Sequence, residues 1–572
     1  GEPVYPAQVE AGGAYVSNKE AKAYYWVFQM RPVRQGEMAA RLGAAFENGW
    51  PDPFGKSAED VASWLWNDLL ASNPFGNYGV LVPWPEEDDD QLGHGGWVAY
   101  SRRQVCYITA KSFFGGKLWR YNSGLFRLMN MCTEACDFRA SFATLLASCA
   151  ADETLADGKQ GPMILVAKAG VAPPVEEVRA LAENVQLESS GLRICDYDAE
   201  AGPFENVEAV PPAGCAPRSA TAPGVDFMTG GLERQVTQDI SASWFGGYLF
   251  DAKACGLGGG QDERLSVYFP EVTILAYFLS TSSPYPQVRQ PVWFLGTRNF
   301  FKNLDGTARF DSPLVLSDVP VDDSNLETVT LAGNSYQIDK SRPVVVFMSE
   351  SQGFFDETKP NLALARTNRL PSQRDMGAGE FAFEKQVRAW YRSMALNSYD
   401  EAVRPILKQL SSSVGAGPWL AGLWWGDSQL GFLAAWLGQA LAAKTWDQPL
   451  PLDYYLYADF TENPGNMCYI LPGASCEKCL DICQNPDPPE SAYWMPDNAF
   501  VGGRPCVEDK SICGREGFDD VVAAVLGRSV ADVWREIENK VAANPVSVNV
   551  FDALLDEEDF GVLVLAIRSS GE

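Results

Sequence analysis

Histidine is almost absent from this chain, whose 572 residues include only His94. Structural zinc sites need four sulfur or nitrogen ligands and commonly combine two short Cys or His motifs. The chain has one such motif, CEKC at 476–479, but no second CxxC follows it and His94 is far away in the sequence. We therefore expect no zinc site, and we expect no other metal or cofactor.

Positive charge and long uninterrupted apolar runs are also scarce. The chain has 45 Lys and Arg against 74 Asp and Glu, a formal charge of −29. Because such a surface repels polyanions, we expect no nucleic-acid binding through a basic face. The longest apolar tract, 417–443, is interrupted by Asp427, Gln429 and Gln439. It predicts a loop and a buried helix, so we expect no transmembrane segment.

Cysteine is concentrated in one part of the chain. Of 13 cysteines, six lie between Cys468 and Cys513, in a segment rich in proline. Three local disulfides that staple this segment are the favoured interpretation, and free thiols are the alternative. Disulfides would place the protein outside the cell or in an organelle lumen, whereas free thiols would favour the nucleus or cytoplasm.

The hydrophobic pattern predicts an α/β fold of several parts. Apolar residues recur at helical spacing in the first half, at 58–72 and 101–116. Later, β-branched runs at 291–297, 342–350 and 453–459 are separated by helical patterns at 380–395 and 428–443, and a further helical pattern covers 517–543. Strands interleaved with helices indicate a layered core.

Three regions follow from these patterns. We predict a mainly helical accessory region over 1–225, with an irregular insertion at about 151–225 that contains a strand or two. The α/β core is expected over 226–465. Residues 466–572 are expected to form a Cys-rich segment and a helical extension, and this extension is where we expect protein partners to bind.

A glycine cluster precedes two acids in GLGGGQDERLSVYFPE, residues 256–271. Glycine lets the backbone approach a ligand closely and present N–H groups to phosphate oxygens. The adjacent acids Asp262 and Glu263 would then lie beside the reacting group. Alternatively, the glycines form an ordinary loop and the acids start a helix, where they complement its dipole.

The order of several segments resembles the poly(ADP-ribose) glycohydrolase family, whose signature is a Gly-rich loop, Gln-Glu-Glu and a short apolar run ending near Pro-Glu. Here Gln261, Asp262, Glu263, Pro270 and Glu271 follow the glycines. Five more segments look like family segments in the same order: SRRQVCYITAKSFFGG at 101–116, DISASWFGG at 239–247, PVWFLGTRNF at 291–300, GPWLAGLWWGD at 417–427 and YYLYAD at 454–459.

The resemblance implies a macrodomain-like fold, a mixed sheet between helical layers, with an N-terminal helical accessory region before it. It also implies cleavage of ribose–ribose O-glycosidic bonds in poly(ADP-ribose), with ADP-ribose as the released product. Glu263 would be the acid/base and Asp262 would orient the leaving ribose. Further ligand-binding positions implied in the same way are Gln261, Asp239, Gly246, Gly247, Gly258, Gly259, Gly260, Gly422, Trp424, Trp425 and Gly426. The family's aromatic residue that stacks on adenine falls near Gly306 and Thr307, which cannot stack, so Tyr457, Tyr455 or Phe310 would take that role.

Several residues depart from the family pattern. Asp262 replaces a longer glutamate, and Ala242 stands where the family's Asp-x-x-Asn pair, here beginning at Asp239, has its asparagine. Trp424 and Trp425 replace smaller residues and either stack on a base or belong to the core. The alternative function is therefore a catalytically silent relative, which binds ADP-ribose or serves as a structural or interaction subunit of a larger assembly.

Overall fold

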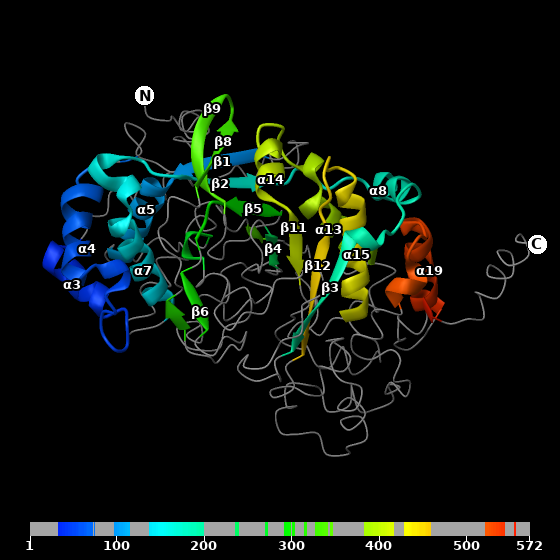
Figure 1. The fold of residues 1–572 in the computed structure, drawn as a ribbon, viewed down its shortest axis with the longest axis horizontal. Coiled ribbons are helices and arrows are strands. Elements are labelled where there is room, and N and C mark those ends of the chain that lie inside the picture. The colour runs from blue at the N-terminus through cyan, green and yellow to red at the C-terminus, as the bar shows by residue number, and fades with distance from the viewer. Residues whose placement is uncertain are drawn as a thin grey trace, which may run out of the picture.

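The computed structural model describes most of the layered core of the chain. The described residues are 33–72, 74, 96–114, 137–198, 235–239, 269–272, 291–298, 300–303, 314–316, 326–340, 344–346, 383–416, 428–458, 521–543 and 554–555. Helices and a mixed sheet make up these residues, so the protein has an α/β fold (Figure 1).

The described residues form one ten-stranded sheet and a separate strand pair. The strands of the sheet are β1 (Gly96–Ser101), β2 (Met163–Lys168), β3 (Leu192–Asp198), β4 (Gln235–Asp239), β5 (Val292–Leu295), β8 (Leu326–Leu331), β9 (Asn334–Asp339), β10 (Val344–Val346), β11 (Ser413–Ala416) and β12 (Leu452–Ala458). The order is β3-β12-β11-β4-β10-β5-β2-β9-β8, and β1 pairs with β2. Strands β6 (Phe301–Asn303) and β7 (Leu314–Leu316) form a separate antiparallel pair.

Strand direction divides the sheet into two parts. Neighbouring strands β3, β12, β11, β4 and β10 are all parallel. Strand β5 runs antiparallel to both β10 and β2, while β1 is antiparallel to β2 and β8 to β9. The five parallel strands therefore end at one edge of the sheet, which we call the carboxyl edge. Strands β1 and β5 end at the opposite edge, which we call the amino edge.

Helices cover both faces of the sheet (Figure 1). On one side lie α3 (Gln35–Gly43), α4 (Ala58–Trp64), a π-helical turn (Leu65–Leu69), α5 (Arg102–Phe114) and α7 (Asp137–Ala151). On the other lie α8 (Val175–Ala182), α13 (Phe383–Met394), α14 (Arg404–Leu410), α15 (Ser428–Ala443) and α19 (Val530–Ala543). Short 3-10 turns occur at Pro53–Gly55, Glu153–Gly158, Ser189–Gly191 and Leu396–Ser398.

Strand β2 shows why the sheet needs both helical layers. All six of its residues are buried, which is typical of a central strand covered on both faces. Because side chains alternate along a strand, Ile164 and Val166 join the core beneath α5 and α7. Met163, Leu165 and Ala167 join the core beneath α13 and α15. The protein is therefore a three-layer structure of helices, sheet and helices.

The elements predicted from periodicity are confirmed where the structure describes them. The patterns at 58–72, 101–116, 380–395 and 428–443 correspond to α4 with its π-helical turn, α5, α13 and α15. The runs at 291–297 and 342–350 contain β5 and β10, and the run at 453–459 covers all of β12 except Leu452. The tail pattern 517–543 divides into a helical turn at 521–525 and α19.

The sheet and its core extend across the predicted regions. Strands β1, β2 and β3 come from 1–225, yet they are hydrogen-bonded into the sheet with strands of 226–465. Trp534 of α19, from 466–572, lies in the same core cluster as Val178 and Phe383. The first part of 151–225 supplies the inner strand β2 and the edge strand β3, whereas 199–225 lies outside the described residues.

A disulfide joins two helices of the N-terminal layer. Cys106 of α5 and Cys149 of α7 are bonded across 43 residues, and both are buried. The sequence did not predict this pair, since neither cysteine belongs to a cluster. The six cysteines of 468–513, with their three predicted disulfides, lie outside the described residues.

Candidate functional site

The carboxyl edge of the sheet brings together three of the segments that carry the resemblance. Strands β4, β11 and β12 are adjacent and parallel. The 239–247 segment begins at the last residue of β4, the 417–427 segment directly follows β11, and the 454–459 segment includes most of β12. Ligands of open α/β sheets bind outside the carboxyl ends of parallel strands, so this edge is the candidate site.

Two of the predicted site residues lie on these strands. Gly415 of β11 is in register with both Thr237 of β4 and Asp453 of β12. Asp239 lies two residues beyond Thr237, and Tyr457 lies four residues beyond Asp453. With strand spacing near 4.8 Å and a rise near 3.3 Å per residue, their backbones are on the order of 12 Å apart.

Helix α15 begins at the same edge. It connects β11 to its parallel neighbour β12, so its first residue, Ser428, follows the 417–427 segment at the carboxyl end of β11. A helix of 16 residues carries partial positive charge at its start, where the first N–H groups have no partner within the helix. The candidate site therefore contains a helix N-terminus of the kind that binds phosphate groups.

Most of the predicted site residues lie outside the described residues. These are the acids Glu263 and Asp262 together with Gln261, Gly246, Gly247, Gly258, Gly259, Gly260, Gly422, Trp424, Trp425 and Gly426. The 239–247 and 417–427 segments continue from the carboxyl ends of β4 and β11, whereas the 256–268 segment leads into Phe269 beside the Glu271 network. For these residues the roles implied by the resemblance stay predictions.

A buried cluster of charged side chains lies at the amino edge. We call it the Glu271 network, and it consists of Arg102, Asp152, Glu271, Arg298 and Asp339. The five side chains are each at most 3% exposed. They come from the start of α5, the residue after α7, the short helical turn 269–272, the chain after β5 and the end of β9.

Glu271 is held by two different groups. Its Oε1 accepts from Arg102 Nη1 at 2.5 Å, and its Oε2 accepts from the backbone N–H of Arg298 at 2.8 Å. Arg102 also donates from Nη2 to the carbonyl oxygen of Gly296 at 2.9 Å. Gly296 has a φ of +84°, and a Cβ there would lie 2.6 Å from the Met163 carbonyl oxygen, so only glycine fits this turn.

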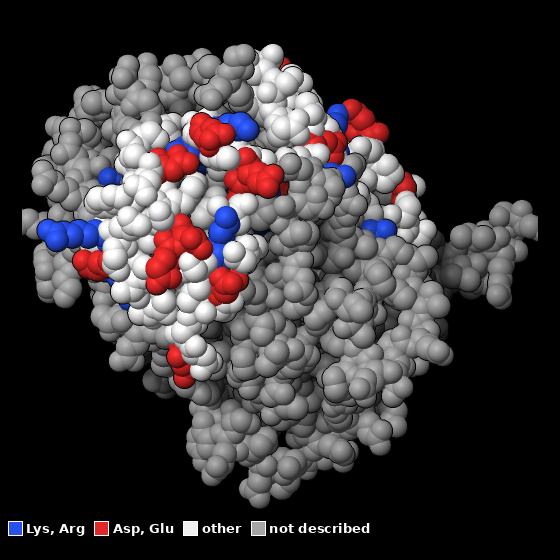
Figure 2. Space-filling view, turned by 60° about the vertical axis from the view of Figure 1, so that its left-hand side comes forward, with Lys and Arg blue, Asp and Glu red and all other residues white. Residues whose placement is uncertain are grey.

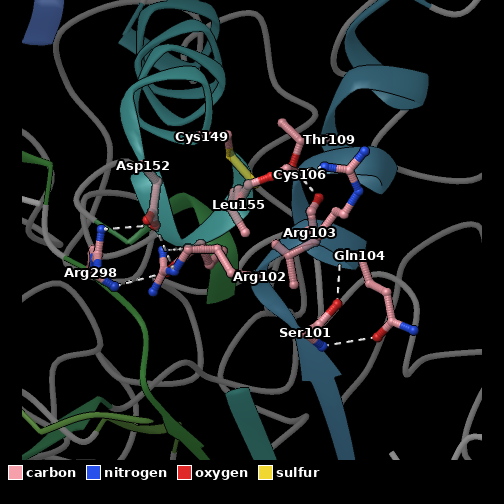
Figure 3. Close-up of a disulfide and its surroundings, with 12 residues drawn as sticks. Ser101, Arg102, Arg103, Gln104, Cys106, Thr109, Cys149, Asp152, Leu155 and Arg298 are labelled. Atoms are coloured by element: carbon pink, nitrogen blue, oxygen red, sulfur yellow. Dashed lines mark hydrogen bonds and ion pairs between the residues drawn. A yellow bond between two sulfur atoms is a disulfide. The ribbon is translucent and has the colours of Figure 1, made fainter. Parts of the chain in front are cut away.

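Two aspartates complete the network. Arg298 Nε donates to Asp339 Oδ2 at 3.1 Å, and Arg298 Nη1 lies 3.6 Å from Asp152 Oδ2. Figure 3 shows Arg102 and Arg298 directed toward Asp152, whose Oδ2 is 4.0 Å from Arg102 Nε. Asp152 Oδ1 in turn accepts from the backbone N–H and hydroxyl of Thr154, at 2.9 and 2.5 Å.

Burial dominates the electrostatics of Glu271 and Arg298. It raises the pKa of Glu271 above the usual glutamate range, against the attraction of Arg102 and Arg298. It also lowers the pKa of Arg298, and the charge of Arg102 acts in the same direction. Ionised groups remain in such surroundings only when closely paired, which explains why arginines and carboxylates alternate through the cluster.

The network joins the other three segments that carry the resemblance. Arg102 belongs to 101–116, Glu271 ends 256–271, and Gly296 and Arg298 lie in 291–300. Sequence reasoning placed Pro270 and Glu271 in the signature, but it assigned Glu271 no role. None of the other network residues was predicted; these are Arg102, Arg298, Asp152 and Asp339. The adjacent Arg102 and Arg103 at the start of an apolar helix could have indicated a functional role for these two charges.

The described surface gives little support for other classes of site. Figure 2, with the N-terminal helical side turned forward, shows acidic side chains with separate Lys and Arg side chains between them. Within the described residues no group of three or more His, Cys, Asp or Glu side chains is arranged to hold a metal ion. No helix in this part of the chain is both long and apolar enough to cross a membrane.

Comparisons with known proteins add no family assignment. The chain matches no protein-family model, and no curated protein is significantly similar to it in sequence.

Proposed function

We propose that the protein is a hydrolase of the poly(ADP-ribose) glycohydrolase type, with a macrodomain-like core between its helical layers. It would cleave ribose–ribose O-glycosidic bonds and release ADP-ribose. The observation that carries the proposal is the grouping of the six resembling segments. Two segments begin at the carboxyl ends of the adjacent parallel strands β4 and β11, and a third includes most of the neighbouring strand β12. The other three each contribute residues to one buried network.

Glu263 supplies the chemistry in this proposal. Breaking a glycosidic bond passes through an oxocarbenium-like state, and the leaving oxygen needs a proton. Glu263 gives that proton as a carboxylic acid and then, as a carboxylate, activates the attacking water. Asp262 hydrogen-bonds the leaving ribose, and its like charge favours one protonated carboxyl in the pair.

Backbone groups bind the diphosphate in this proposal. The glycines at 246–247 and 258–260 and the 422–426 segment present N–H groups to its oxygens. The start of α15, which directly follows 417–427, adds its dipole. Neutral donors of this kind allow a chain with a charge of −29 to bind a dianionic ligand locally, without a metal.

A silent ADP-ribose binder is the second candidate, and two residues favour it. Asp262 is shorter than the family's glutamate by about one methylene, and Ala242 cannot make the hydrogen bonds of an asparagine. Each lost hydrogen bond would cost about 1–3 kcal/mol of ribose binding. Such a protein would bind ADP-ribose through the same edge of the sheet without cleaving the polymer.

The first prediction tests catalysis through Glu263. We expect Glu263→Gln to lower ADP-ribose release from poly(ADP-ribose) by a factor of about 100 or more, because the amide neither gives nor takes the proton. Released ADP-ribose is quantified by chromatography. Glu177→Gln is the matched control, because Glu177 is an exposed acid on α8 outside the candidate site, and it should release ADP-ribose at the wild-type rate.

Calorimetry with ADP-ribose separates the two candidates. Equal release by the wild type and Glu263→Gln would reject Glu263 as the acid/base. Binding without release in the wild type would identify a silent binder. A wild type that neither binds nor releases ADP-ribose would overturn the proposed function altogether.

A further inference from the structure

We propose that the Glu271 network is a positioning device for the catalytic acid, because it fixes the point where the signature segment 256–268 enters the core. This inference rests on the proposed function, in which Glu263 is that acid. The network residues do not touch substrate in this scheme. They act by holding the turn 269–272 in one place.

The turn is held by both polar and apolar contacts. Phe269 and Val272 are fully buried in the core of the N-terminal helical layer. Between them, the two oxygens of Glu271 accept from Arg102 Nη1 and from the backbone N–H of Arg298. The turn is therefore fixed against both the start of α5 and the chain after β5.

The arginines that hold Glu271 are themselves held. Arg102 reaches the Gly296 carbonyl oxygen, and Arg298 reaches Asp339. Asp152 lies beside both arginines and is fixed by Thr154. Each residue of the Glu271 network thus contacts at least one other element. A shift of Glu271 would therefore disturb contacts between several elements of the core.

The charged side chains of the network are not needed merely to attach the turn 269–272 to the core. Buried ion pairs lose much of their attraction to desolvation, and apolar residues of similar size often stabilise a fold as well or better. Phe269 and Val272 already supply an apolar anchor. Directional hydrogen bonds to both oxygens of Glu271 add a defined position for the turn. A defined position matters for catalysis, because a misplacement of the catalytic group by about 1 Å lowers a rate about 100-fold.

The distances suit such a role. Glu271 lies eight residues after Glu263, and eight residues span about 12 Å even when helical. Because this separation along the chain is short, a fixed position of Glu271 restricts where Glu263 can lie.

The test compares Glu271→Gln with a matched control. Glu271→Gln keeps the size of the side chain and removes its charge. The control is Asp68→Asn, which removes the carboxylate bound at 2.6 Å to Arg103, the neighbour of Arg102 on α5. Both variants lose an ion pair to a buried arginine on the same helix, but only the first touches the turn 269–272.

Two measurements are made on the full chain. Hydrogen exchange followed by mass spectrometry reports on peptides of 256–268, and steady-state kinetics of ADP-ribose release gives kcat and KM. For Glu271→Gln we expect exchange in 256–268 to rise by about tenfold or more. We expect kcat to fall about 10-fold to 100-fold while KM changes less than about threefold. Asp68→Asn should leave all three quantities near wild type.

Other outcomes also decide the matter. Unchanged exchange and unchanged kcat in a folded Glu271→Gln protein would overturn the proposal, as would equal effects of Asp68→Asn. If Glu271→Gln does not fold, Arg102→Lys, which keeps a cation but loses the fork to Glu271 and Gly296, is measured in its place. If the wild type is inactive, the proposed function fails, and the exchange of 256–268 alone shows whether the network fixes this segment.

Discussion

Gly438 shows how one residue sets the distance between two helices. It lies in α15, where a Cβ would be 2.6 Å from Trp390 Cβ and 2.9 Å from the Val387 carbonyl oxygen of α13. Trp390 in turn donates from its indole N–H to Gln439 Oε1 at 3.0 Å. The lack of a side chain at 438 therefore lets α13 and α15 approach closely enough for this bond.

We predict that Gly438→Ala destabilises the protein. The added methyl group must displace backbone and a buried tryptophan, so we expect the free energy of unfolding to fall by about 1–3 kcal/mol. Chemical denaturation followed by fluorescence measures this change. Gly36→Ala in α3 is the control, since a Cβ there meets nothing within 4 Å and should be neutral or stabilising. Equal effects of the two variants would contradict the packing argument.

The roles of some single residues could not be predicted from the sequence. Glu271 was recognised as part of a signature, but its burial and its bond to Arg102, 169 residues away, depend on the tertiary fold. One sequence shows which residues are charged, but it does not show which charges are buried. The turn between β8 and β9 is a different case, because its Ala332 and Gly333, both with positive φ, form a two-residue turn typical of hairpins. The hairpin of β8 and β9 could therefore have been predicted from its local sequence, but it was not.

At the scale of elements, the disulfide between Cys106 and Cys149 fixes α5 to α7. The helices pack over one face of β1, β2 and β5, and α5 carries Arg102 at its first residue. The end of α7 leads directly to Asp152, whose N–H donates to the Cys149 carbonyl oxygen. The disulfide therefore joins the two helices that supply Arg102 and Asp152 to the Glu271 network (Figure 3).

We predict that removing this disulfide lowers stability. A cross-link across 43 residues reduces the entropy of the unfolded chain. The loop-length relation gives about 4 kcal/mol for its loss. Cys106→Ala with Cys149→Ala should therefore lower the denaturation midpoint, and reduction of the wild type should bring its midpoint close to that of the double variant. A midpoint that the double substitution does not change would contradict the prediction.

Elements with strong periodicity could be predicted, and isolated ones could not. Helix α15 matches its predicted range because an apolar tract of that length favours a buried helix even where single polar residues interrupt it. Strands β4 (QVTQD) and β11 (SVGA) contain no run of three β-branched or aromatic residues like those that indicated β5 and β10. Their place at the centre of the parallel sheet comes from pairing with distant strands, and this is why the candidate edge was not predicted as one location.

At the scale of the whole molecule, the C-terminal part of the chain completes the core. Trp534 of α19 is 1% exposed and packs edge-on against Phe383 of α13. Its indole N–H donates to Glu538, and the Arg179 guanidinium of α8 lies 4.8 Å from its ring centroid. Helix α19 is thus held by contacts with both α8 and α13.

We predict that Trp534→Ala destabilises the whole fold. Loss of a buried tryptophan leaves a cavity and should cost about 3–5 kcal/mol of unfolding free energy. Trp66→Ala is the control, since this side chain is 40% exposed, and it should change stability by less than about 0.5 kcal/mol. Thermal unfolding monitored by circular dichroism compares the two. A small loss for Trp534→Ala would mean that α19 is dispensable to the core.

The pairing of β3 with β12 has a consequence during synthesis. Leu192 to Asp198 pair in parallel with Leu452 to Ala458, so each pair joins residues 260 positions apart. At about 5–20 residues per second, the ribosome needs roughly 13–50 s to make the partner of β3 after β3 itself. Throughout that interval a new chain exposes an unpaired strand edge, the kind of surface that promotes aggregation. We therefore expect that productive folding requires the first third of the chain to delay its folding until β12, the last parallel strand, has emerged from the ribosome.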